Sequence, residues 1–314
     1  MKTLLIIPSK KANDCIHTKN ALVFDSLKLC FEFKNTMKKA MKNLMKNKQT
    51  DFITKYFKFR SPLRQRACFI LSLLGLLIPL AVWWLLSHAG LVEKVFMPTP
   101  EDVLKRSYEW LIEDSLLADI WISVFRVLCG FIISALIALP IALMIGCYRS
   151  VQAFFEPITD FIRYMPAVAF IPLVMIWVGI DEGAKISIIF IGTFFQMVLM
   201  MAEDIRRVPM AQIEAAQTMG ASRGELTLKV ILQSAKPALL DTMRITMGWA
   251  WSYLVVAEIV AANSGLGYAI LKAQRFLQTD KIFAGILIIG LIGLLMDQGF
   301  RWLHRKSFPW LYFK

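Results

Sequence analysis

The most prominent pattern in this chain is a series of apolar stretches separated by polar segments. A bilayer core of roughly 30 Å is crossed by about 20 helical residues, so the length of an apolar stretch indicates whether it can span a membrane. Spans are predicted at residues 68–87, 120–147, 166–180, 186–201, 239–261 and 282–302. The pattern therefore predicts an all-α, polytopic membrane protein with about six transmembrane helices.

Two of these spans carry prolines that disturb a regular helix. Pro140 lies inside the second span, and we expect that helix to tilt or kink. The third span is short and contains Pro166 and Pro172. Irregular backbone at membrane depth is tolerated only where protein or a water-filled cavity covers it. We therefore expect the third span to be a broken helix buried among its neighbours.

The polar segment between the fourth and fifth spans has the pattern of two short helices joined by a turn. Pro209 suits the first position of a helix, so residues 210–219 can wind as a short helix behind it. Gly220 can adopt the left-handed conformation that ends such a helix. Ser222 and Glu225 have the Ser-x-x-Glu spacing of a capping box, which opens a second helix.

Composition agrees with a membrane protein, and the charge is concentrated near the N-terminus. Hydrophobic residues make up 57% of the chain, and the mean hydropathy is +0.56. The formal net charge is +13, and residues 1–67 contain sixteen Lys or Arg against four acidic residues. That tail carries nearly all of the imbalance, so the basic charge does not indicate nucleic-acid binding. We interpret residues 1–59 as a basic, flexible cytoplasmic tail before a transmembrane domain at residues 60–314.

The charges of the loops indicate which side of the membrane each one faces. Basic residues gather in the cytoplasmic loops of membrane proteins. The segment at residues 88–118 has six acidic residues against three Lys or Arg, which is typical of an outer loop. The segment at residues 203–237 has five Lys or Arg, and the C-terminal end has four. With an even number of spans, both termini and the 203–237 segment are expected in the cytoplasm.

Several motifs between residues 95 and 305 resemble one family when taken together. The 203–237 segment contains Glu214-Ala215-Ala216, three further residues, Gly220, nine residues and then Val230-Ile231-Leu232-Gln233. The other motifs are Met97-Pro98-Thr99-Pro100 with Val103, Arg126 with Gly130-Phe131, the stretch from Pro166 to Gly179, Arg244-Ile245 with Gly248 and Ala250-Trp251, Val255 with Ala257-Glu258, and Gly265-Leu266-Gly267. They resemble the permeases of binding-protein-dependent ABC importers, in the nitrate, sulfonate, taurine and bicarbonate branch. Gln233 departs from that family's pattern, which has proline there.

The resemblance implies a type I importer-like permease fold whose 203–237 segment is a loop that couples to a separate ATPase subunit. The ATPase-coupling residues would be Glu214, Ala215, Ala216, Gly220 and Ser222. It also implies a periplasmic or lipoprotein substrate-binding protein, a bacterial inner-membrane location in contact with lipid, and a homodimer, although a heteromeric pair stays open. The sequence has no Gly-x-x-x-x-Gly-Lys-Ser/Thr phosphate loop, so ATP hydrolysis is expected in the other subunit. We expect no catalytic residue, cofactor or metal in this chain.

Some polar residues within the spans are candidates for the translocation pathway. Arg126 lies near the outer end of its span, where it either extends to the interface or attracts an anion at the pathway mouth. A helical wheel gathers further candidates into an arc of about 120° on the fifth span. Its members are Asp241, Arg244, Gly248, Trp251, Ser252 and Glu258. This arc faces either the pathway or a partner helix, or it belongs to ordinary helix packing.

Other functions remain open at this point. An ion-gradient-driven secondary transporter would show related halves with matched broken helices, and no such repeat is evident. A membrane-embedded enzyme would need clustered His and carboxylate groups, whereas His17, His88 and His304 are far apart in sequence. The five cysteines contain no Cys-x-x-Cys pair, which argues against a zinc site. Thiamine-precursor or riboflavin-like solutes are alternatives to a small anion as the imported substrate.

Overall fold

The computed structural model describes residues 65–90, 93–113 and 115–312. The predicted tail at residues 1–59 lies outside these ranges. The chain divides into two compact units, Met1–Pro79 and Leu80–Lys314, and the boundary falls inside helix α3 (Gln65–His88). All the sites described below belong to the second unit.

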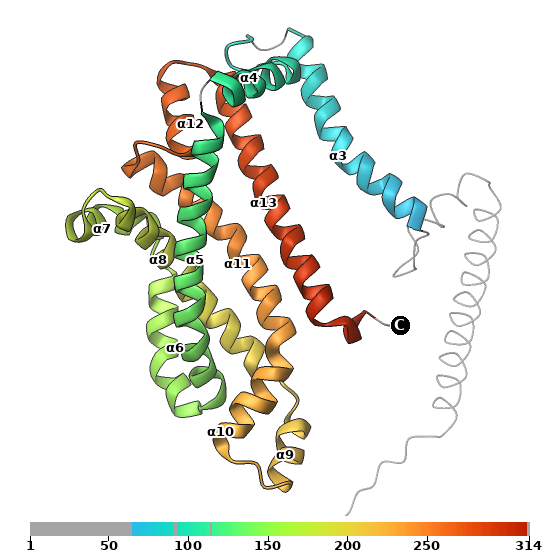
Figure 1. Cartoon of the computed structure of the whole chain (residues 1–314), viewed down its shortest axis with the longest axis vertical. Coiled ribbons are helices and arrows are strands. Elements are labelled where there is room, and N and C mark those ends of the chain that lie inside the picture. Colours follow the sequence, from blue (N-terminus) through green and yellow to red (C-terminus); the bar gives the residue numbers. More distant parts are fainter. Residues whose placement is uncertain (1–64, 91–92, 114, 313–314) are drawn as a thin grey trace, which may run out of the picture. The chain divides into compact units, whose positions relative to one another are not determined.

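Every regular element in the described ranges is a helix (Figure 1). After α3 the elements are α4 (Pro100–Glu113), α5 (Leu116–Cys147), α6 (Arg149–Arg163), η1 (Ala167–Phe170), α7 (Ile171–Val178), α8 (Glu182–Arg206), α9 (Met210–Thr218), α10 (Arg223–Glu225), the π-helix η2 (Leu226–Ile231), α11 (Leu232–Ala261), α12 (Leu266–Arg275), α13 (Thr279–Ser307) and η3 (Pro309–Leu311). The all-α prediction is confirmed.

Among the described residues, four helices are individually long and apolar enough to cross a membrane: α3, α5, α8 and α13. Two bent pairs also qualify within the described residues: α6 with the η1–α7 segment, bent by 85°, and the α10–α11 segment with α12, bent by 53°. Counting each bent pair as one span gives six, as predicted. The third span is broken, as predicted, but it begins at Arg149 and bends between α6 and η1. It is not buried among its neighbours as expected, since Ile176 and Trp177 are exposed over 78% and 72% of their surfaces.

Small residues let the central helices approach one another closely. In α5, Gly130 lies against Ile189 of α8, and Gly146 lies against Ile205. A Cβ atom at these glycines would come within 2.8 Å and 2.5 Å of the isoleucine side chains. Tight contact between small residues is a common way to hold helices together in a membrane, where burial from water contributes little. The core of the unit therefore lies between α5, α8 and α11.

The two ends of the helix bundle carry different structures (Figure 1). Helices α4 and α12 lie at one end, and α9 and α10 lie at the other. Residues 88–118 are predicted to form an outer loop, but the segment contains helix α4, which Thr99 caps by accepting a hydrogen bond from the Asp102 N–H at 3.2 Å. Val103 and Trp110 of this helix are buried in a cluster with Leu266 of α12. The segment is thus packed onto the bundle.

Candidate functional site

The α9–α10 segment is a helical turn held by its own backbone hydrogen bonds. Gly220 has φ +82°, the left-handed conformation predicted for it. The Gly220 N–H donates to the Gln217 carbonyl at 2.9 Å, and the Ala221 N–H donates to the Ala216 carbonyl at 3.0 Å. This pair of bonds is a Schellman motif, which satisfies the last carbonyls of a helix. The helix therefore ends where the sequence predicts.

The second half of the turn is closed by the predicted capping box. The Ser222 hydroxyl accepts from the Glu225 N–H at 3.4 Å, and a Glu225 carboxylate oxygen accepts from the Ser222 N–H at 3.1 Å. The element is also tied to α11, since Ser234 donates a hydrogen bond to the Gln212 side chain at 2.5 Å. Ala216 is buried against the bundle. These bonds hold the turn in one shape without any partner protein.

The exposed side of α9 carries a charged side chain, a small alanine side chain and two methionine side chains. Glu214 and Ala215 are exposed. Met210 and Met219, at the two ends of the helix, are exposed over 63% and 81% of their surfaces. Methionine adapts its shape to a partner and is frequent at protein-binding surfaces. We call residues 209–225 the coupling element from here on, after the ATPase-coupling role that the sequence resemblance predicts for them.

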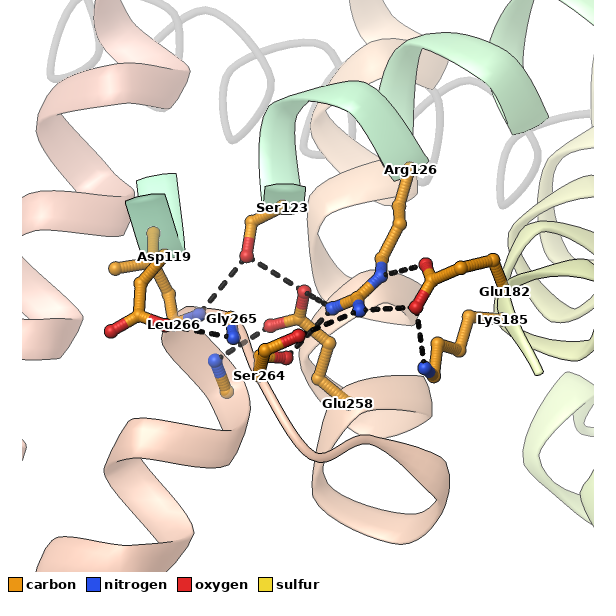
Figure 2. A network of polar contacts seen from close by, with 10 residues as sticks. Asp119, Ser123, Arg126, Glu182, Lys185, Glu258, Ser264, Gly265 and Leu266 are labelled. Atoms are coloured by element: carbon orange, nitrogen blue, oxygen red, sulfur yellow. Dashed lines mark hydrogen bonds and ion pairs between the residues drawn. The ribbon is translucent and has the colours of Figure 1, made fainter. Parts of the chain in front are cut away.

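A second site lies at the α4–α12 end and is centred on Arg126 of α5 (Figure 2). Its guanidinium lies between two carboxylates from different helices. It donates to Glu258 of α11 at 2.7 Å and to Glu182 of α8 at 2.7 Å. It also donates to the Ser264 carbonyl at 2.8 Å, and Lys185 pairs with Glu182 at 2.7 Å. One arginine therefore joins α5, α8 and the α11–α12 connection.

The α11–α12 connection is held to α5 by backbone donors as well. The Gly265 N–H donates to Asp119 at 3.0 Å, and the Leu266 N–H donates to Ser123 at 3.0 Å. The Gly267 N–H donates to Glu258 at 2.7 Å (Figure 2). Gly265 has φ +106°, and a Cβ there would lie 2.4 Å from a Glu258 oxygen. This position therefore accepts only glycine without rearrangement.

Because Arg126 and Glu258 are buried, their charges must be paired for the folded protein to be stable. The Arg126 and Glu258 side chains have no exposed surface, whereas Glu182 is 45% exposed. An ion taken out of water is stable only when its partners replace the lost hydration, and removing one partner leaves a costly unpaired charge. Arg126 makes five hydrogen bonds, which use all the directions in which a guanidinium donates. Its predicted exposure at the interface or pathway mouth is not observed, because these bonds hold the side chain inside.

The arc predicted on the fifth span divides among several environments. Arg244 pairs with Asp241 at 3.4 Å and with Asp297 of α13 at 3.4 Å. Trp251 is buried in the core, and its indole N–H has no hydrogen-bond partner among the described residues. Gly248 and Ser252 are exposed. Glu258 belongs to the Arg126 network, so the structure does not bring the arc together as one site.

Four members of the Arg126 network were not predicted from the sequence: Asp119, Ser123, Lys185 and Ser264. The signal for the first two was present, because Asp119, Ser123 and Arg126 are spaced by four and three residues and therefore share one face of a helix. Glu182, at the first position of α8, is ion-paired with Arg126 and Lys185. Among the described residues no group of three His, Cys, Asp or Glu side chains could hold a metal ion.

Membrane-length helices with a folded α9–α10 segment at one end define a helical, multi-pass membrane protein. Residues 136–308 match the family described as binding-protein-dependent transport system inner membrane component, and the chain belongs to this family. It is thus a multi-pass permease subunit of an ABC importer, a system in which the ATPase is a separate subunit and a substrate-binding protein is a further partner.

Curated relatives match most of the chain. A probable ABC transporter permease protein of Brucella melitensis is 35% identical over 240 residues, which cover 76% of this chain and 96% of the relative. The taurine transport system permease protein of Escherichia coli is 33% identical over 258 residues, covering 81% and 93%. A putative aliphatic sulfonates transport permease protein of Bacillus subtilis is 34% identical over 239 residues, covering 75% and 87%.

A solved structure shows the same fold. It is a methionine ABC transporter in inward-facing conformations, with a TM-score of 0.50 and 22% sequence identity. The alignment covers 59% of this chain and 94% of that chain. The type I importer-like permease fold expected from the sequence is therefore confirmed.

Proposed function

We propose that two copies of this chain form the translocation unit of an importer for a small anionic or sulfonate-like solute. Each copy receives the motion of one ATPase subunit through its coupling element. The observation that carries the proposal is the coupling element itself, which is folded by a Schellman motif and a capping box and presents Glu214, Met210 and Met219 outward. The relatives named for taurine and aliphatic sulfonates support the solute class. Family membership leaves the ion-gradient alternative without support.

In this proposal the coupling element and both chain termini face the cytoplasm. The basic residues of the 203–237 segment and of the C-terminal end support this orientation. The Arg126 network and α4 then lie at the outer end, since they are at the opposite end of the bundle (Figure 1). The basic tail at residues 1–59 would also be cytoplasmic.

The proposed dimer would cover an apolar surface on the bent α6–α7 pair. Tyr164 and Ile176 are exposed over 77% and 78% of their surfaces, and Phe161 and Trp177 over 71% and 72%. Exposed apolar surface of this extent faces lipid or another protein. In the proposal, a second copy of the chain covers part of this apolar surface, and the translocation pathway runs between the two copies. The other apolar surfaces face lipid.

The dimer can be tested by the composition of the purified complex. We expect two copies of this chain with two ATPase subunits, because each copy presents one coupling element. Native mass spectrometry of the complex, extracted in mild detergent, measures this ratio directly. A single copy per ATPase pair, or a second distinct permease chain, would reject the homodimer.

The docking role can be tested by reversing the charge of Glu214. Glu214→Lys should lower ATPase recovery with the purified permease by about tenfold, equivalent to about 1.4 kcal/mol for one charged contact. The matched control is Glu113→Lys, which makes the same change at an exposed position of α4 at the other end of the bundle. Equal ATPase recovery with both variants would mean that Glu214 is not part of the docking surface.

A further inference from the structure

Helix α4 carries a row of exposed apolar side chains. The row, which we call the α4 stripe, consists of Leu104, Tyr108, Leu111 and Ile112. These side chains are exposed over 46% to 70% of their surfaces. At about 100° per residue they share one side of the helix, in an arc of about 100°. Val103 and Trp110 point in another direction and are buried against α12 and α13, so the stripe is not what holds α4 on the bundle.

A third side of α4 is charged. At the same angle per residue, five charged side chains fall in a separate arc of about 100°: Asp102, Lys105, Arg106, Glu109 and Glu113. Glu101 is the exception, because it falls within the apolar arc, and its carboxylate accepts a hydrogen bond from the Trp84 indole at 2.9 Å. Helix α4 thus has a buried side, an apolar side and a charged side. An exposed apolar side beside a charged one is typical of a helix that lies in the plane of a membrane interface.

The position of α4 along the chain places it at the level of the membrane surface. The membrane-length helix α3 ends at His88, and the membrane-length helix α5 begins at Leu116, three residues after α4 ends. The Trp83 indole N–H donates to the Pro98 carbonyl at 3.2 Å, which ties the start of α4 to the end of α3. Tryptophan is enriched where a span meets water. Helix α4 runs across the end of the bundle, at a steep angle to α5 and α13 (Figure 1).

We propose that α4 is an interfacial helix whose stripe is embedded in the lipid leaflet at its end of the bundle, while its charged side faces water. At the start of α5, Leu117 and Trp121 are exposed over 66% and 73% of their surfaces, and these side chains mark the lipid-facing surface at the same level. In the orientation proposed above, the leaflet is the outer one.

Lipid fits the stripe better than either protein partner of the proposed importer. The apolar surface assigned to the second copy lies on the α6–α7 pair, on the other side of α5 from α4 in Figure 1. A binding protein approaches from water, which the charged side of α4 faces in the proposal. The inference goes beyond the importer function, because it requires only that the spans cross a bilayer. Measurements of uptake therefore do not decide it.

Spin labels on the two sides of α4 test the proposal. The full chain with its five native cysteines replaced by serine, in complex with its ATPase, is placed in nanodiscs of phosphatidylethanolamine and phosphatidylglycerol. A nitroxide is attached after Leu104→Cys, Tyr108→Cys or Ile112→Cys on the stripe, and after Lys105→Cys or Glu113→Cys on the charged side. All five positions are exposed, so the labels leave the buried core unchanged.

The measured quantity is the collision rate of each nitroxide with oxygen, which concentrates in lipid, and with a neutral nickel chelate, which stays in water. The ratio of the oxygen rate to the nickel rate should be at least fivefold higher on the stripe than on the charged side. A second copy on the stripe would instead lower both rates and broaden the spectra by coupling between copies. A binding protein would leave the stripe open to nickel until it is added. Either result, or equal ratios on the two sides, would overturn the proposal.

Two neighbouring aspartate substitutions test whether the stripe holds the helix in the leaflet. With the label at position 108, Leu104→Asp should raise the nickel collision rate at least threefold, because an ionised carboxylate is costly in lipid. Lys105→Asp adds the same side chain one position along, on the charged side, and should leave the rate unchanged. Equal nickel rates in the two variants would contradict the anchoring role of the stripe.

Discussion

Replacing Arg126 by leucine is expected to remove most of the folded protein from the membrane. The variant leaves the fully buried Glu258 without its cation and Glu182 without its main partner. Breaking a buried pair in this way costs about 3–5 kcal/mol, a large part of the stability of a typical domain. The midpoint of thermal unfolding in detergent and the amount of monodisperse protein measure the loss.

A double variant separates the charge effect from the loss of packing. Arg126→Leu with Glu258→Leu removes both buried charges, and an apolar replacement of a buried pair is often tolerated. We expect the double variant to be more stable than Arg126→Leu alone, although not equal to the native protein, because the Gly267 and Ser264 bonds are also lost. A double variant no more stable than the single one would show that the buried charge is not the cause.

Gly220→Val is expected to reduce ATP-driven uptake about tenfold while leaving the amount of inserted protein unchanged. Gly220 has φ +82°, and a β-branched residue is strained in that conformation by about 1–3 kcal/mol. No atom lies within 4 Å of the added Cβ, so the strain acts on the turn and not on the packing of the bundle. ATP hydrolysis and uptake, measured on the same proteoliposomes, should become uncoupled.

The matched control for this variant is Gly224→Ala in the same element. A Cβ at Gly224 also meets no atom within 4 Å, but this glycine is in the helical conformation that alanine favours. Uptake by Gly224→Ala should match the native value. If Gly220→Val also transports normally at normal membrane levels, the left-handed turn is not needed for coupling.

The coupling element was predictable because its structure is local. Gly220, Ser222 and Glu225 act on backbone groups a few residues away, so the spacing of residue types is enough to predict the turn and the cap. The spans were predictable for a similar reason, since bilayer thickness sets the length of an apolar helix. Helix α4 was missed because its amphipathic pattern lies in a segment rich in charge, and its buried face depends on α12 and α13.

The Arg126 network was only partly predictable because its partners are distant in the chain. The sequence shows that Arg126 and Glu258 are costly in a membrane, but no local pattern pairs residues that are 132 positions apart. The helical wheel on the fifth span could not separate the surroundings of its members for a related reason. It grouped Glu258 with Arg244 by angle alone, whereas the two contact different helices, α5 and α13. One face of a long helix packs against different helices at different positions along its length, and a helical wheel does not show those positions.

The long separation between Arg126 and its partners has a consequence for biogenesis. A ribosome adds roughly 5–20 residues per second, so Glu258 emerges roughly 7 to 26 s after Arg126. Glu182 is made sooner, 56 residues after the arginine. For that interval the nascent chain holds an arginine in its first helices with an incomplete set of partners. The Arg126 network is therefore completed only once Glu258 and the α11–α12 connection have been made, and a chain truncated before Glu258 would hold the arginine with Glu182 but without its buried partner.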